Sequence, residues 1–87
     1  MVIGSPEDID AIAGALENYL NVIEEETGRF SAAFAQYGES WQDRERQAFE
    51  ACFQDLLAMQ SRFLEEAARQ IPELRMMADH LRAYQRR

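Results

Sequence analysis

The chain has 87 residues, of which 47% are hydrophobic, and its formal net charge is −7. This hydrophobic content is too high for a disordered chain, and four Gly and two Pro are too few for the many turns of an all-β protein. An all-α fold is therefore expected. A domain this short buries only about 60–65% of the surface that its unfolded chain exposes, so a monomer would be marginally stable.

The negative charge is concentrated in the first part of the chain, where seven acidic residues precede the first basic residue, Arg29. From Arg29 onward, nine arginines balance nine acidic residues. Nucleic acids and anionic membranes both require a basic surface, so neither is expected as the main partner. The alternative interpretation is that these acids form an ordinary solvated helix face.

The single cysteine, Cys52, excludes a disulfide framework within the chain and fits a reducing compartment. No apolar run reaches the roughly 18 residues that a membrane span requires. Residues 1–4 lack the charged and long apolar regions of a secretory signal. We therefore expect a cytoplasmic protein, or one that is exported without a cleaved signal peptide.

The first predicted helix covers residues 5–37. Ser5 provides an N-cap hydroxyl, Pro6 suits the first helical position, and Asp8 stands at the third. Gly38 follows at the place of a C-cap glycine. Two apolar rows then recur every seven residues, as in helices that pack along their length: Ile9, Leu16, Ile23, Phe30 and Tyr37, and Ala13, Leu20, Thr27 and Phe34.

The second predicted helix covers residues 41–71, with Ser40 as its N-cap and Asp43 three residues later. The predicted turn, residues 38–40, is so short that the two helices must be antiparallel neighbours. The second helix has a wider apolar stripe than the first, which indicates burial against more than one neighbour.

Pro72 removes a backbone donor and crowds the preceding turn, so the sequence predicts a kink or a break there. Residues 72–87 are expected to form a kinked C-terminal helical arm outside the hairpin. Its apolar positions continue at helical spacing, so the arm must dock either on its own bundle or on a second subunit, and we favour the second subunit. Residues 1–87 thus form one helical-hairpin domain, predicted to dimerise into a four-helix bundle.

No motif in the chain carries catalytic chemistry. The only histidine, His80, lacks the Glu-x-x-His spacing of di-metal bundles, and Cys52 has no histidine neighbour to activate it. We expect His80 at the surface and Cys52 as a small packed hydrophobe. The sequence therefore predicts no catalytic, cofactor or metal site, and a protein that is not an enzyme.

Trp41 stands at the tip of the predicted hairpin, where its ring can lie over the last turn of the first helix and hold the turn together. Trp41 and Phe49, eight residues apart, resemble the Trp-x-Gly turn and following aromatic of the WXG family, the helical hairpins of type VII secretion. Asp43 stands where that family has Gly. The family's export signal, Tyr-x-x-x-Asp/Glu, is not found after Tyr84. The resemblance implies a helical hairpin that pairs with itself or with a related chain.

The leading functional hypothesis is a non-enzymatic, WXG-like hairpin that works by helix-mediated association, as a homodimer or a heterodimer, and that is related to type VII secretion. The alternative is a cytosolic helical adaptor or regulatory subunit unrelated to secretion. Beyond the turn motif of Trp41, Asp43 and Phe49, the candidate interface residues lie on the stripe of the second helix and arm: Phe53, Leu57, Leu64, Leu74, Met77, Leu81 and Tyr84.

Overall fold

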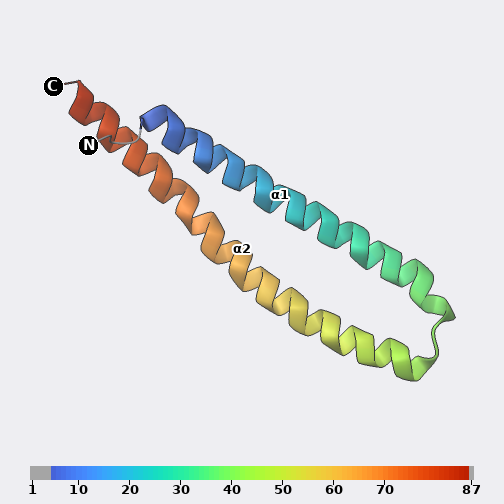
Figure 1. Ribbon diagram of the computed structural model, residues 1–87. Coiled ribbons are helices and arrows are strands. Elements are labelled where there is room, and N and C mark those ends of the chain that lie inside the picture. Colours follow the sequence, from blue (N-terminus) through green and yellow to red (C-terminus); the bar gives the residue numbers. More distant parts are fainter. Residues whose placement is uncertain (1–4, 87) are drawn as a thin grey trace.

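The computed structural model describes residues 5–86, so the predictions for residues 1–4 and 87 lie outside the described part. Helix α1 covers Pro6–Tyr37, a 3-10 turn η1 covers Gly38–Ser40, and helix α2 covers Asp43–Gln85. The two helices pack side by side and run in opposite directions (Figure 1). The prediction of an all-helical hairpin is confirmed. The hairpin is a rod that measures 68 × 20 × 18 Å.

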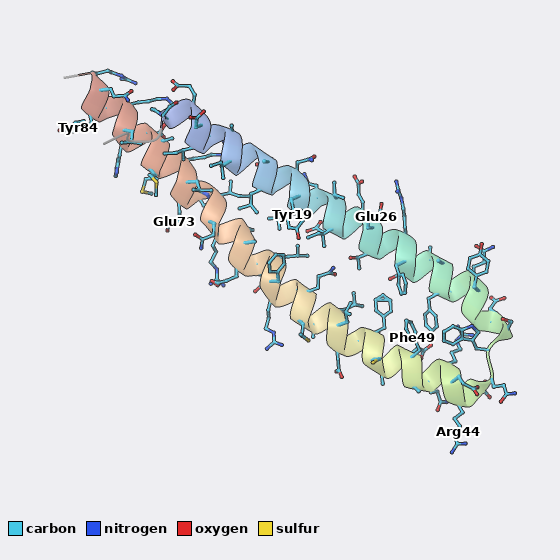
Figure 2. All side chains as sticks on the ribbon, in the orientation of Figure 1. Tyr19, Glu26, Arg44, Phe49, Glu73 and Tyr84 are labelled. Carbon is cyan, nitrogen blue, oxygen red and sulfur yellow. The ribbon has the colours of Figure 1, made fainter. Side chains whose placement is uncertain are left out.

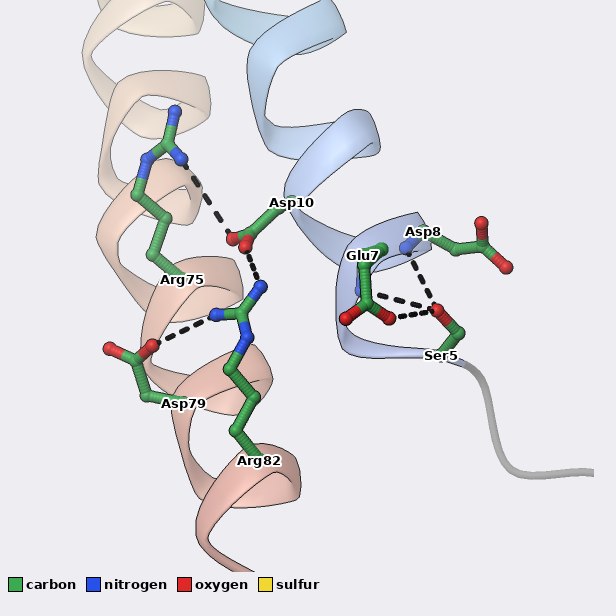
Figure 3. Close-up of polar contacts among 7 residues, drawn as sticks. All are labelled: Ser5, Glu7, Asp8, Asp10, Arg75, Asp79 and Arg82. Atoms are coloured by element: carbon green, nitrogen blue, oxygen red, sulfur yellow. Dashed lines mark hydrogen bonds and ion pairs between the residues drawn. The ribbon is translucent and has the colours of Figure 1, made fainter. Parts of the chain in front are cut away.

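Helix α1 begins as its sequence predicts. The Ser5 hydroxyl oxygen accepts hydrogen bonds from the backbone N–H groups of Glu7, at 3.2 Å, and Asp8, at 3.4 Å (Figure 3). The same hydroxyl donates to the Glu7 carboxylate at 2.7 Å, and this bond lowers the pKa of Glu7. Pro6 is fully buried at the first helical position.

The turn differs from the prediction at Ser40. Ser40 lies inside η1 and its hydroxyl donates to the Tyr37 carbonyl oxygen at 3.0 Å, so Ser40 is not the N-cap of α2. Trp41 and Gln42 are extended, and α2 begins at Asp43. Because the Ser40 hydroxyl is engaged in a hydrogen bond within the 3-10 turn, it does not cap α2, and the helix starts two residues later than expected.

The structure also differs from the prediction beyond Pro72. Helix α2 continues through Pro72 to Gln85 without a break. Pro72 is exposed, so the one carbonyl that loses its helical partner can be hydrated. Ala78 is fully buried, and Arg82 forms an ion pair with Asp10 of α1. Residues 72–82 are therefore part of the hairpin rather than a separate arm, because α1 extends far enough back to cover them.

The seam between the helices follows one heptad row of α1 closely and the other only in part. Ala13 and Leu20 of the second row are buried, and Thr27 and Phe34 are half-buried. The first row begins half-buried at Ile9 but becomes exposed at Phe30 and Tyr37. A seven-residue row drifts by about 20° per heptad around a straight helix, so its last members rotate out of the seam.

Gly38 is needed for packing and not for an unusual backbone angle. Its φ is −69°, in the right-handed region, and its N–H donates to the Phe34 carbonyl. A Cβ at position 38 would lie 3.0 Å from Cε1 and 3.1 Å from Cδ1 of Phe34. The ring of Phe34 therefore occupies the space that any other residue at position 38 would require.

We predict that Gly38→Ala destabilises the chain by about 1–3 kcal/mol, the usual cost of overpacking. The control is Gly14→Ala, where nothing lies within 4 Å of the added Cβ. This substitution should stabilise the helix by about 0.5–1 kcal/mol, because Ala loses less backbone entropy than Gly. Chemical denaturation of both variants measures the difference, and a Gly38→Ala variant as stable as the wild type would contradict the packing argument.

Candidate association surface

Five aromatic rings fill the space between the two helices near the turn (Figure 2). Phe34 and Phe49 have ring centroids 4.9 Å apart, and Phe30 meets Phe53 edge-on at 5.2 Å. Trp41 contacts Phe34 at 5.6 Å and Phe49 at 5.5 Å, both in edge-on geometry. Such geometries are favourable for aromatic pairs. Trp41 thus joins the last turns of α1 to the first turns of α2.

The three residues of the turn motif have different roles. Phe49 is half-buried in the aromatic cluster, whereas Trp41 remains 42% exposed at its edge. Asp43 is exposed and is the first residue of α2. Its negative carboxylate interacts favourably with the positive end of the helix dipole. The structure therefore brings Trp41 and Phe49 together and leaves Asp43 outside their contact.

We predict that Trp41→Ala destabilises the hairpin by about 2–3 kcal/mol, less than the 3–5 kcal/mol typical of a fully buried large aromatic. Trp41→Phe should recover much of this loss, because a smaller ring can still meet Phe34 and Phe49. Thermal unfolding followed by circular dichroism provides the measurement. An unchanged melting temperature for Trp41→Ala would show that Trp41 does not hold the turn.

One side of the hairpin is polar and carries ion pairs between the helices. Arg82 pairs with Asp10, and Arg75 lies 3.8 Å from the same carboxylate (Figure 3). Arg75 also lies 3.6 Å from Glu17. The hydrogen bond with Asp10 raises the pKa of Arg82. Gln54 lies on the same side of α2, seven-residue steps before Arg75 and Arg82. We call this side the polar face and define it by Asp10, Glu17, Gln54, Arg75 and Arg82.

We predict that Asp10→Asn lowers the melting temperature slightly, and that high salt reduces the difference from the wild type, because partly exposed ion pairs are screened. Amide exchange in the first turns of α1 should accelerate, since Asp10 ties them to α2. Glu66→Gln is the matched control, because Glu66 pairs at 2.9 Å with Arg69 of its own helix. Equal effects of the two variants would refute a role for Asp10 between the helices.

The opposite side of the hairpin is apolar. Near the turn it contains a groove of about 500 Å³, which is lined by Ile23, Glu26, Phe30, Phe49, Cys52 and Leu56, among others. On α1, the exposed Ile12 and Tyr19 precede Glu26 in steps of seven residues. On α2, the exposed Phe63, Met77 and Tyr84 follow Leu56 in steps of seven residues. These side chains therefore continue the same side of each helix. We call this side the apolar face and define it by Ile12, Tyr19, Phe30, Leu56, Phe63, Met77 and Tyr84.

Most of the predicted interface residues are used within the hairpin itself. Phe53 is buried, and four others are half-buried along the side of α2 that faces α1: Leu57, Leu64, Leu74 and Leu81. Met77 and Tyr84, by contrast, are 52% and 72% exposed and lie on the apolar face. The expected stripe thus divides into a seam and an exposed row beside it.

The sequence prediction did not include four members of the apolar face among the interface residues, and it placed a fifth, Phe30, in the heptad row of the seam. Leu56 and Phe63 stand seven residues apart on α2, and Ile12 and Tyr19 do so on α1. These rows flank the seam at heptad spacing, which was the available signal. Two rows that both lie next to the seam can only be assigned to the same side of the hairpin once the rotation of each helix is known.

The other residues considered from the sequence are at the surface. His80 is exposed as expected, but Cys52 is exposed rather than packed in the core. Among residues 5–86, no group of three His, Cys, Asp or Glu side chains is arranged to hold a metal ion. Within the same range, no helix combines the length and apolar character that a membrane span requires.

Comparison with protein-family models, with curated proteins and with solved structures gave no match to this chain.

Proposed function

We propose that the chain is a non-enzymatic helical hairpin that acts by association, through its apolar face, with a second helical chain. The partner is a copy of the same chain or a related hairpin, and together they form a four-helix bundle. The observation that carries the proposal is the sidedness of the hairpin. Its interhelical ion pairs lie on the polar face, whereas large hydrophobic side chains are exposed along the length of the other face.

The proposed role follows from the cost of that exposure. Burial of apolar surface stabilises a complex by roughly 25 cal/mol per Å². Large exposed apolar patches commonly mark association sites. An isolated two-helix hairpin has only one seam in which to bury apolar groups. A second hairpin gives the exposed rows a neighbour.

In its more specific form, we propose a WXG-like role as a partner or substrate in type VII secretion. The contact between Trp41 and Phe49 across the turn supports this version. The Asp at position 43, where that family has Gly, instead favours the alternative of a cytosolic adaptor. Tagged protein in the culture medium, lost when the secretion ATPase of the source cell is deleted, would support the first version and contradict the second.

We predict that the purified chain is a dimer at micromolar concentration and that Phe63→Glu weakens the dimer at least tenfold, because a charge would be buried in an apolar interface. Light scattering coupled to size exclusion measures the mass. Ser61→Glu is the matched control, since position 61 is exposed and lies on the polar face, seven residues after Gln54. A wild-type chain that remains monomeric and unfolds cooperatively alone would contradict self-association.

A further inference from the structure

We propose that the side chains of Met76, Met77 and His80, which lie outside the seam of the hairpin on α2, bind one Cu(I) ion. All three donors come from one chain, so this inference goes beyond the proposed association and does not depend on it. Three observations carry it: the placement of the donors on the helix, the depression that they line, and the chemistry of the donor set.

The spacing of the three residues places them on one patch of α2. Met76 and Met77 precede His80 by four and three residues. Side chains at these separations are neighbours on a helix, with Cβ atoms about 5–6 Å apart. Helical side chains also lean toward the N-terminus of their helix, which brings the imidazole of His80 toward the turn that carries both methionines. Two flexible thioethers can therefore reach the imidazole without a change in the backbone.

The same side chains line an open depression of about 310 Å³, together with Glu73 and Leu81 (Figure 2, where Glu73 is labelled). Met76 is 56% exposed and Met77 is 52% exposed, and His80 is exposed as well. Leu81 is half-buried toward the seam and closes the depression on that side. A metal ion can therefore reach the sulfur and nitrogen atoms directly from solvent.

The chemistry of the donor set favours copper. Thioether sulfur is a soft ligand that prefers Cu(I), and neutral imidazole binds copper as well as zinc and iron. Zinc sites are built from thiolate, imidazole and carboxylate groups, and the described part of the chain brings no three such side chains together. The prediction of no metal site considered Glu-x-x-His patterns, in which thioethers have no part. Two adjacent methionines beside the one histidine of the chain instead supply soft, neutral donors.

The charge around the depression suits a cation. Glu73 precedes Met77 by four residues and lies on the same patch of the helix. Among residues 5–86, Glu73 forms no ion pair, in contrast to Glu66 and Asp79 of the same helix. Its carboxylate can therefore balance the single positive charge of Cu(I). The net charge of −7 adds a general attraction for cations.

The test measures Cu(I) binding to the full chain without oxygen, by competition with the chromogenic Cu(I) chelator bicinchoninate. A Cys52→Ser background removes the exposed thiol, which would otherwise bind Cu(I) elsewhere on the chain. We expect one Cu(I) ion per chain, and a dissociation constant raised at least about tenfold by Met76→Leu and by His80→Ala. Because leucine keeps the approximate size of methionine, Met76→Leu removes the sulfur with little effect on packing.

Met59→Leu is the matched control, because Met59 is 64% exposed on the same helix and has no Met, His or Cys within four residues. This variant should bind Cu(I) as tightly as its parent, and circular dichroism should show equal helicity for all variants. X-ray absorption of the copper-bound parent should show two sulfur donors and one nitrogen donor.

Three outcomes would overturn the site: a parent chain that takes no Cu(I) from bicinchoninate, equal affinities of Met76→Leu, His80→Ala and Met59→Leu, or tighter binding of Zn(II) than of Cu(I). Light scattering on the same samples keeps the two proposals apart. One ion per chain is expected for a monomer and for a dimer alike, so a monomeric mass would contradict self-association and leave the copper site intact.

Discussion

The arrangement of this hairpin depends on the packing of aromatic rings between the two helices at the turn. Phe34 lies at the centre of this packing, because it meets Trp41, Phe49 and Phe53 within 4.9–6.5 Å and also contacts the backbone of Gly38 too closely to allow a Cβ there. These rings fix how the chain reverses direction. The helices lie farther apart at this end than at the other, where Ala13 and Ala78 are buried (Figure 1).

Polar contacts then fix which side of each helix faces outward. The Thr27 hydroxyl lies 3.0 Å from the Gln60 side-chain oxygen in the middle of the seam, and Asp10 meets two arginines at its far end. This polar pair favours one register, because another register would take this partner from the Gln60 side chain, whereas the Thr27 hydroxyl also lies 2.7 Å from the Ile23 carbonyl oxygen of its own helix. With register and rotation set in this way, the hydrophobic rows that do not fit into the seam come together on one side.

Much of the fold could be predicted from local sequence because the relevant interactions are local. The Ser5 cap, the end of α1 at Tyr37 and the heptad rows depend on residues within one or two helical turns. The start of α2 could not be predicted in this way, because Ser40 can either cap a helix or close a 3-10 turn. Only the packing of Trp41 against the phenylalanines decides between these two roles of Ser40. The continuation through Pro72 depends on contacts with α1 that are distant in sequence.

The candidate surface was harder to predict than the fold for a geometric reason. Leu57 and Leu56 are adjacent, yet the first is half-buried and the second exposed on the apolar face. A rotation of α2 by one residue, about 100°, would exchange their roles. The hydrophobic pattern of α2 is wide enough to permit more than one such rotation, so the choice is made by the partner helix and not by α2 itself.

The small seam also links folding to association. Within residues 5–86, the buried hydrophobic side chains apart from Pro6 are Ala13, Leu20, Phe53 and Ala78, and two of these are alanines that bury little area. Conformational entropy opposes the ordering of every residue in both helices, and long helices gain most of their stability from packing. A partner that binds only the folded hairpin stabilises it by mass action. In the proposed association, burial of the apolar face would add the packing that a single seam leaves incomplete, so the same surface would serve both stability and recognition.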